Sequence, residues 1–571
     1  MFDVLIRGGT VFDGLGSEPL AVADVAISGG IVVEIGHVTG SARQTIDASD
    51  RFVAPGFIDG HTHLDAQIFW DPYAGSLAAH GVTSAVMGNC GFTLAPGTQE
   101  QADLIIASIE RAEDMSREAI ERGVPWRWTT FAEYMDAVDA LPKALNVAAQ
   151  CGHSALRASV MGDRAFTDRA TDDEVQRMRR AVQEAISAGA MGFSTSRSRA
   201  HLTKAGDPVA SRIASWDEVS AIVTGMGEAG AGLFQLAPER PADPGEMADY
   251  QGRLRRLAVT SGRPVTFMVG GQKEQLDAVD QVMAGGGTAI GQVHVRRFEN
   301  VFGFRTTLPF DRLPLWKAVR SASLDEQRER LLDPQLRARL VAEAESGDYG
   351  EAVGAEVRAP QFDQITIIDG SSGGVRGGRP PGTAQPVEPS VADVARARGV
   401  SPVEVMIELS LDGRFEQLFR QPISQTSSEL ILAGLRHPST VVAASDSGAH
   451  ISQILDSNIP TYFLSHWVRG EGAFTWAQAI HMLTGAPARV WGLERRGVLG
   501  AGAFADVVVF DPAAVGCAAP TVLNDLPDGG PRLAQSATGI DATLVNGQVI
   551  TSGGQRTGAT PGVLLRVQGP R

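Results

Sequence analysis

Two histidines stand one residue apart, directly after a short apolar segment. They are His61 and His63, in the run Gly56-Phe-Ile-Asp-Gly-His-Thr-His63. Residues two positions apart in an extended chain project to the same side. Both imidazoles can therefore reach one divalent ion, at the usual nitrogen–zinc distance of about 2.0–2.1 Å. The apolar strand in front of the pair favours a metal site over two solvent-facing histidines.

Two further side chains could complete this site. Cys90 lies in Met87-Gly-Asn-Cys-Gly91, and a thiolate there would suit zinc. Asp446 follows another apolar run and could take a proton from an activated water and return it to a leaving group. Alone, Cys90 would be a buried core residue and Asp446 a helix cap. Beside the histidine pair, we interpret both as metal ligands and Asp446 also as the catalytic base.

Other reactive side chains fall near the ends of apolar runs. Each is more typical of a hydrogen-bonding role, but each is also a candidate contact for a metal or a substrate. This set comprises His153, Arg197, His201, Gln235, His294 and His450. Arg197, together with Arg296 and Arg297, could bind a carboxylate group of a substrate.

Short apolar runs that alternate with helix-like stretches must position these side chains. Such alternation is typical of βα units around a parallel sheet. The eight candidate strands are Phe52–Ile58, Thr83–Met87, Leu145–Gln150, Ala190–Thr195, Ala231–Ala237, Pro264–Val269, Thr288–Val293 and Thr440–Ala444. Eight units are what a closed (β/α)₈ barrel requires, and barrel chemistry takes place at the carboxyl ends of the strands. The alternative is an open doubly wound sheet, but no Gly-rich dinucleotide motif follows the first strand.

Both ends of the chain differ from this pattern, since they contain short strands and turns. Gly29-Gly30, between two β-prone runs, predicts a hairpin. We therefore predict an α/β fold, a TIM-like barrel over residues 55–494, with a small β-sandwich domain formed by residues 1–54 and 495–571. An insertion within about 298–425 contains a charged helical run, Asp325–Glu345, and a Gly/Pro-rich stretch, Ser371–Pro389. It could be a lid over the barrel, a solvated excursion or an oligomer contact.

Length, net charge and cysteine content limit the classes of partner that the protein could bind. The chain has 571 residues, a formal charge of −16 and three cysteines. The negative charge argues against nucleic acid or an anionic membrane as a partner, and the few cysteines indicate no disulfide framework. The first residues do not read as a signal peptide, and we find no long apolar run. We expect a cytoplasmic protein that acts on a small molecule and could form a homo-oligomer.

These residues together resemble the amidohydrolase superfamily, and more closely its D-aminoacylase branch (N-acyl-D-amino-acid deacylases). The similarity rests on Pro55–His63, Gly88–Gly91 and Ser445-Asp446, and it extends to the late segment RGVLGAGAFADVVVFD at 496–511. The resemblance implies a barrel with a β-domain and one or two zinc ions. It also implies that His61, His63 and Cys90 are ligands and that Asp446 is a weak ligand and the acid/base group.

The sequence also departs from that branch, whose fifth and sixth strands each normally supply a histidine. Here these strands read Gly232-Leu-Phe-Gln-Leu-Ala-Pro238 and Pro264-Val-Thr-Phe-Met-Val-Gly270, without histidine. The chain therefore resembles a divergent subgroup. The expected activity is deacylation of an N-acyl-D-amino acid. The alternatives are hydrolysis of a cyclic amide, a lactone, an ester or another unusual acyl substrate, and a degenerate, non-catalytic binding protein.

Overall fold

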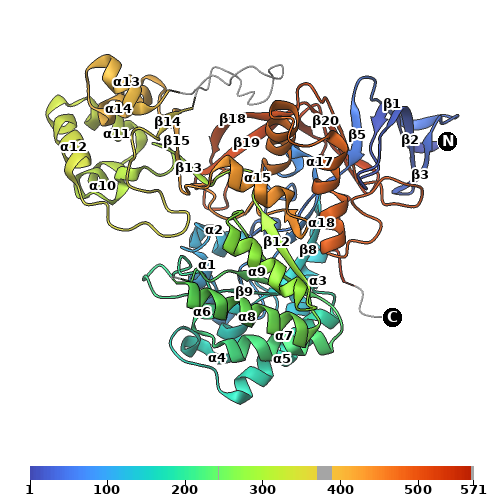
Figure 1. Cartoon of the computed structure of the whole chain (residues 1–571). Coiled ribbons are helices and arrows are strands. Elements are labelled where there is room, and N and C mark those ends of the chain that lie inside the picture. Colours follow the sequence, from blue (N-terminus) through green and yellow to red (C-terminus); the bar gives the residue numbers. More distant parts are fainter. Residues whose placement is uncertain (242, 369–388, 568–571) are drawn as a thin grey trace.

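The centre of the protein, in a computed structural model that describes residues 1–241, 243–368 and 389–567, is a sheet of eight parallel strands (Figure 1). These strands are β6 (Phe57–Asp59), β7 (Val82–Met87), β8 (Asn146–Gly152), β9 (Gly192–Ser196), β10 (Leu233–Ala237), β11 (Val265–Met268), β12 (Ala289–Val293) and β16 (Thr440–Val442). Every neighbouring pair in this sheet is parallel. The predicted barrel strands are therefore present, with bounds shifted by a few residues.

The order of the strands distinguishes a barrel from a doubly wound sheet. The strands follow one another in chain order from β6 to β16, without the reversal that a doubly wound sheet requires. Beyond the two edge strands, backbone hydrogen bonds join Asp446 N to His61 O at 3.3 Å and His63 N to Ser447 O at 2.8 Å. These bonds bring the first and last strands together, and the predicted (β/α)₈ class is confirmed.

The first predicted strand is two strands in the structure. Phe52–Pro55 (β5) belongs to the terminal sheet, where it pairs with β1 and β17, and only β6 belongs to the barrel. The chain changes sheets at Gly56, where a Cβ would come within 2.2 Å of the Thr83 side chain. The close approach of β7 at this point thus requires glycine.

Helices cover the outside of the barrel. Those between and after the barrel strands are α1 (Ala102–Ile109), α2 (Arg117–Gly123), α3 (Phe131–Asp139), α4 (His153–Met161), α5 (Asp172–Ser187), α6 (Ala210–Ile213), α7 (Trp216–Glu228), α8 (Pro244–Ser261), α9 (Lys273–Ala284), α15 (Ser428–Arg436), α16 (Ile459–Tyr462), α17 (Trp476–Leu483) and α18 (Gly485–Val490). Helix α5 illustrates how the sequence forms such a helix and packs it on the barrel. A capping box of Thr171 and Glu174 starts the helix, and Met178, Val182 and Ile186 form its buried face.

Both ends of the chain form one nine-stranded sheet. Its strands are β1 (Phe2–Val11), β2 (Leu20–Ser28), β3 (Ile31–Gly36), β4 (Ala42–Asp47), β5, β17 (Val507–Phe510), β20 (Ile540–Val545), β21 (Gln548–Ser552) and β22 (Gln555–Arg556). Gly29 and Gly30 have φ of 59° and 76°, as the predicted hairpin requires. The terminal β-domain of the predicted fold is confirmed; β18 (Gly516–Leu523) and β19 (Arg532–Thr538) form a separate pair.

The last described residues leave the terminal sheet. Val147 in β8 donates to Val563 O at 3.0 Å, Leu565 N donates back to Val147 O at 2.7 Å, and Val567 N donates to Gly189 O at 2.9 Å. Leu565 and Val567 pack on barrel residues such as Met191. This tail therefore closes the amino-terminal end of the barrel, although it lies within the range predicted for the β-domain. The domain bounds themselves stay a prediction.

The insertion between β12 and β16 has its own core. It contains a three-stranded sheet, β13 (Glu299–Gly303), β15 (Leu418–Pro422) and β14 (Thr366–Ile367), and helices α10 (Pro314–Arg320), α11 (Leu324–Leu332), α12 (Pro334–Ser346), α13 (Val391–Arg398) and α14 (Pro402–Asp412). Phe302, Phe310 and Trp316 belong to its buried core. The helices project to one side of the barrel (Figure 1).

Two sequence expectations for the insertion have different outcomes. The charged run 325–345 forms two helices, because Pro334 begins a new one and the Asp333 side chain caps it. Most of the Gly/Pro-rich stretch 371–389 lies outside the described residues. An ion pair of 2.9 Å between Arg111 and Glu356 connects the insertion to the segment after α1. A lid role stays a prediction. Among the described residues, no helix is long and apolar enough to cross a membrane.

Candidate metal centre and active site

Three predicted ligands meet at the carboxyl ends of the first two barrel strands. His61 and His63 follow β6, Cys90 follows β7, and all three side chains are buried. One ligand atom from each residue lies within 4.8 Å of the other two. His61 Nε2 is 3.4 Å from Cys90 Sγ. The one-residue spacing of the histidines thus places both imidazoles on the same side.

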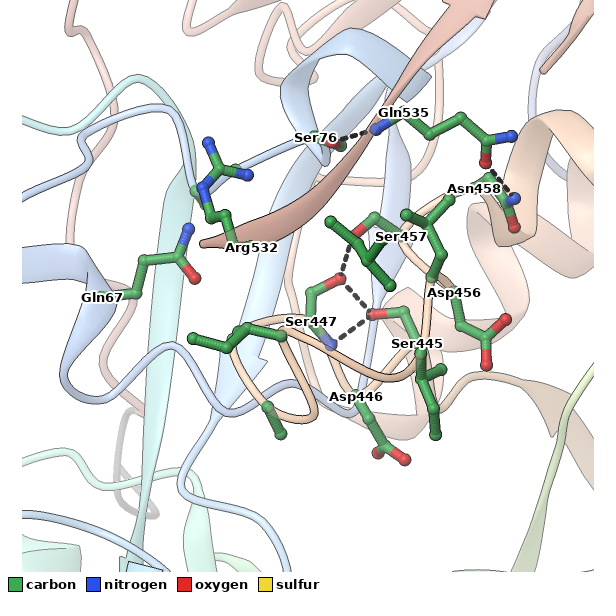
Figure 2. Close-up of a pocket in the computed structure, with 18 residues that line it drawn as sticks. Gln67, Ser76, Ser445, Asp446, Ser447, Asp456, Ser457, Asn458, Arg532 and Gln535 are labelled. Carbon is green, nitrogen blue, oxygen red and sulfur yellow. Dashed lines mark hydrogen bonds between the residues drawn. The ribbon is translucent and has the colours of Figure 1, made fainter. Parts of the chain in front are cut away.

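Asp446 joins this cluster from the loop after β16. Its Oδ1 atom lies 3.3 Å from His61 Nε2 and 3.7 Å from His63 Nε2. The loop approaches β6 closely at Gly448, where a Cβ would be 2.4 Å from His63 O and φ is +95°. Figure 2 shows Asp446 directed away from the hydrogen-bonded serines Ser445, Ser447 and Ser457, which hold the loop.

The strands that lack histidine supply amides and a hydroxyl instead. Gln235 of β10 accepts a hydrogen bond from Cys90 N at 2.6 Å through Oε1. Gln292 of β12 contacts His61 Nδ1 at 2.5 Å through Oε1, and its Nε2 donates to Thr266 of β11 at 3.0 Å. An Nδ1–H donated to Gln292 leaves the Nε2 lone pair of His61 facing Cys90 and Asp446. Side chains of β10, β11 and β12 therefore hold His61 and the backbone at Cys90, two of the predicted ligands, in position.

The donor set fits a zinc-type ion. Thiolate and imidazole are the ligands that zinc prefers. Two atoms bound tetrahedrally at about 2.1 Å lie about 3.4 Å apart, which is close to the His61–Cys90 and His61–Asp446 distances. The buried Nδ1 of His63 and Oδ1 of Asp446 lack hydrogen-bond partners. An ion held by these residues would satisfy Asp446 Oδ1.

Burial dominates the electrostatics of the cluster. It raises the pKa of Asp446 to about 7; the charge of Asp456 adds to this effect and His294 opposes it. Burial also raises the pKa of Cys90, and the charges of Glu113 and Asp446 raise it further. A bound cation would favour the ionised forms of both groups. With an ion bound, the carboxylate of Asp446 would therefore be available to accept a proton from water.

Sequence reasoning missed Glu113. Its side chain is 2% exposed, and its Oε2 lies 3.6 Å from His63 Nε2 and 3.9 Å from His450 Nε2. Glu113 belongs to the charged run Arg-Ala-Glu-Asp, which reads as solvated surface. Gln292 was also missed, although a polar residue inside an apolar strand was a signal that could have found it.

Two of the additional candidates are occupied elsewhere. Both ring nitrogens of His153 have partners, Thr195 Oγ1 at 2.8 Å and Glu218 Oε1 at 3.0 Å. Arg197 pairs with Glu239 at 3.2 Å and lies over a tryptophan ring. Both side chains thus have partners outside the cluster of His61, His63 and Cys90.

The other candidates surround the cluster. His201 packs 5.1 Å from the Phe92 ring and contacts Ser196 Oγ at 2.7 Å through Nδ1. His294 contacts Arg296 O at 2.7 Å, and its Nε2 lies 3.4 Å from Asp456 Oδ2. His450 lies beside Glu113. The structure thus brings His201, Gln235, His294 and His450 to the same end of the barrel.

The arginines expected to bind a substrate carboxylate already have acidic partners. Arg296 pairs with Asp456 and lies 3.6 Å from Glu299, and Arg297 pairs with Glu299 at 3.1 Å. Together with the Arg197–Glu239 pair, these contacts give each of the three expected cations an acidic partner, but Glu239 also pairs with Arg253 and Glu299 also pairs with Arg420.

Comparisons with known proteins agree with this architecture. The model of the family described as "Amidohydrolase family" matches residues 44–551. A D-aminoacylase of Alcaligenes xylosoxydans xylosoxydans is 29% identical over 567 residues, which cover 99% of this chain and 97% of the relative.

Solved structures agree as well. A structure of D-aminoacylase, described by its binuclear metal centre, has a TM-score of 0.65 at 24% identity and covers 99% of this chain and 100% of its own. An N-acyl-D-glutamate deacylase of Bordetella bronchiseptica, solved with zinc and a phosphonate inhibitor, has a TM-score of 0.64 at 23% identity, with the same coverage of both chains. The chain belongs to the amidohydrolase family of metal-dependent hydrolases, in its D-aminoacylase branch.

Proposed function

We propose that this amide hydrolase deacylates an N-acyl-D-amino acid at a zinc centre held by His61, His63, Cys90 and Asp446. The observation that carries the proposal is the convergence of these four side chains at the carboxyl ends of β6, β7 and β16. The similarity to a D-aminoacylase over nearly the full length of both chains supports the substrate class. The zinc in the related glutamate deacylase supports the metal.

The bound ion and the surrounding residues would have different roles in the reaction. A bound divalent ion supplies Lewis acidity and lowers the pKa of a water molecule. Asp446 takes the proton of the attacking water on its carboxylate and delivers it to the departing nitrogen. Gln292 fixes His61, and Gln235 fixes the backbone at Cys90, so the ligands keep their geometry through the reaction.

Replacement of the proton carrier tests the proposal. Asp446→Asn keeps the shape of the side chain but cannot accept a proton, so we expect kcat to fall by about 10²–10⁴-fold or more. The matched control is Asp277→Asn, because Asp277 lies on the outer helix α9, where it pairs with Lys273 at 2.6 Å. It should leave kcat unchanged. Steady-state hydrolysis of N-acetyl-D-amino acids is the measurement, and full activity of Asp446→Asn contradicts the assignment.

One observation favours a second candidate, the hydrolysis of a cyclic amide, a lactone or another uncharged acyl substrate. Arg197, Arg296 and Arg297 are each paired with an acidic residue, so a substrate carboxylate would have to compete with that partner at each of the three. A panel of N-acyl-D-amino acids, their L-enantiomers, cyclic amides and lactones separates the two candidates. Higher kcat/KM for the uncharged ring substrates would overturn the deacylase proposal and leave the metal centre in place.

A further inference from the structure

Glu113 is a buried carboxylate that no part of the proposed mechanism uses. It lies in the segment after α1 and is 2% exposed. Its Oε2 atom has no hydrogen-bond partner, and it lies 3.6 Å from His63 Nε2 and 3.9 Å from His450 Nε2. No lysine or arginine pairs with it in the described part of the chain.

The loop after β16 holds Glu113 in this position. His450 N donates to Glu113 O at 2.5 Å. The next residue, Asp114, accepts hydrogen bonds from Ser452 N at 3.0 Å and Ser452 Oγ at 2.7 Å. The same loop carries Asp446, so one loop positions both carboxylates. The position of Glu113 beside His63 is therefore fixed by backbone and side-chain hydrogen bonds to this loop.

A buried carboxylate without a cationic partner is unfavourable unless it binds a metal or gives up its charge. The atom that Glu113 approaches is His63 Nε2, which also faces Asp446 Oδ1 at 3.7 Å. The Glu113–His63 distance of 3.6 Å falls within the 3.3–3.7 Å range of the other pairs in the cluster. Such distances are typical of two ligands on one ion.

We propose that Glu113 is a further ligand of the metal centre and binds through Oε2 on the side of His63. The inference rests on the proposed function, because it requires the ion held by His61, His63 and Cys90. It supplies an anionic oxygen to a centre whose fifth and sixth strands carry Gln235 and Thr266 rather than histidine. Hard oxygen ligands in place of imidazoles also raise the affinity of the centre for Mn²⁺ relative to softer metal ions.

Metal affinity tests the proposal without reference to activity. Wild-type protein and Glu113→Gln are purified without a His-tag, stripped with a chelator and titrated with Zn²⁺ against a chromophoric chelator. Loss of a partner that only orients a ligand weakens binding by about 10–100-fold, so loss of a true ligand should raise Kd by about 100-fold or more. The visible absorption spectrum of the Co²⁺-loaded protein should change as well, while the Cys90 thiolate-to-cobalt band remains.

The matched control is Glu110→Gln, because Glu110 stands three positions earlier and pairs with Lys204 and Arg117 near the surface. It should leave Kd and the Co²⁺ spectrum unchanged. Zinc-edge anomalous diffraction from wild-type crystals tests the proposal without any substitution that could disturb folding. Glu113 Oε2 should lie within about 2.2 Å of the ion.

The outcomes separate this inference from the proposed function. If wild-type protein binds Zn²⁺ and folded Glu113→Gln binds it equally well, Glu113 is no ligand, but the metal centre stands. A refined zinc position without Glu113 in contact leads to the same conclusion. If wild-type protein binds no Zn²⁺ and hydrolyses none of the panel, the proposed function and this inference both fail.

Discussion

Gln292 lies outside the proposed ligand set but contacts one of its members. It is the partner of His61 Nδ1 at 2.5 Å, and its own orientation is held by Thr266. Replacement of Gln292 by Leu removes the acceptor and leaves the imidazole free to rotate or change tautomer. We expect the Zn²⁺ affinity to fall by about 10–100-fold, as for other partners of metal-bound histidines. Competition with a chromophoric chelator measures it.

The matched control is Gln251→Leu on the outer helix α8, where Gln251 donates to Glu274 O at 3.2 Å, away from the centre. Equal affinity of Gln292→Leu and wild type would show that Gln292 does not orient His61. At this scale, the local sequence pattern predicted side chains that the structure brings together, His61, His63 and Cys90, and their role as metal ligands stays a prediction. Glu113 was out of reach, because its approach to His63 depends on a contact between segments distant in the sequence, whereas the polar Gln292 inside an apolar strand was a signal that could have been used.

At the scale of elements, a buried ion pair fastens α4 to α7. Arg157 is fully buried, and its Nη1 donates to both carboxylate oxygens of Glu218, at 2.6 Å and 2.5 Å. Glu218→Ala leaves a buried guanidinium without its partner, so we expect the free energy of unfolding to fall by about 3–5 kcal/mol. The double variant Arg157→Met/Glu218→Leu should lose much less. Urea unfolding of these variants, the two single replacements and wild type measures the coupling, and additive losses would argue against it.

The elements also show where sequence patterns stop being informative. Periodicity and glycine positions predicted the barrel strands and the Gly29-Gly30 hairpin. They did not predict that Phe52–Ile58 divides between two sheets, because both halves of this segment are apolar and largely buried. The chain changes sheets at Gly56, where the Thr83 side chain approaches the backbone closely. The pairing of residues 563–567 with β8 was equally hidden, since strand partners are set by the whole fold.

At the scale of the whole molecule, His80 joins the barrel to later parts of the chain. Its Nδ1 contacts Thr461 Oγ1 at 2.7 Å, and its Nε2 contacts Gln535 O in β19 at 3.2 Å. Burial lowers the pKa of His80 from 6.5 to about 4. Above pH 6.5 the imidazole is neutral in both the folded and the unfolded chain, so it has no effect on the pH dependence there.

Between pH 6.5 and about 4, the unfolded chain binds a proton at this position and the folded chain does not. The free energy of unfolding should therefore fall as the pH falls through this window, by about 3 kcal/mol in total from His80. In His80→Gln, this part of the slope should disappear. Urea unfolding at about pH 7, 5.5 and 4.5 measures it, and parallel pH profiles of the two proteins would refute it.

The hydrogen-bonded contact between the segments after the first and last barrel strands has a consequence for biosynthesis. His61 and His63 stand near the start of the barrel, whereas Asp446 comes after its last strand, and backbone hydrogen bonds between the two segments close the ring. A ribosome therefore releases the imidazoles long before it makes their carboxylate partner. Nascent or truncated chains can hold the histidine pair but not the proton carrier. In the proposed mechanism, hydrolysis therefore requires the complete barrel, and binding of the ion would stabilise the closed ring.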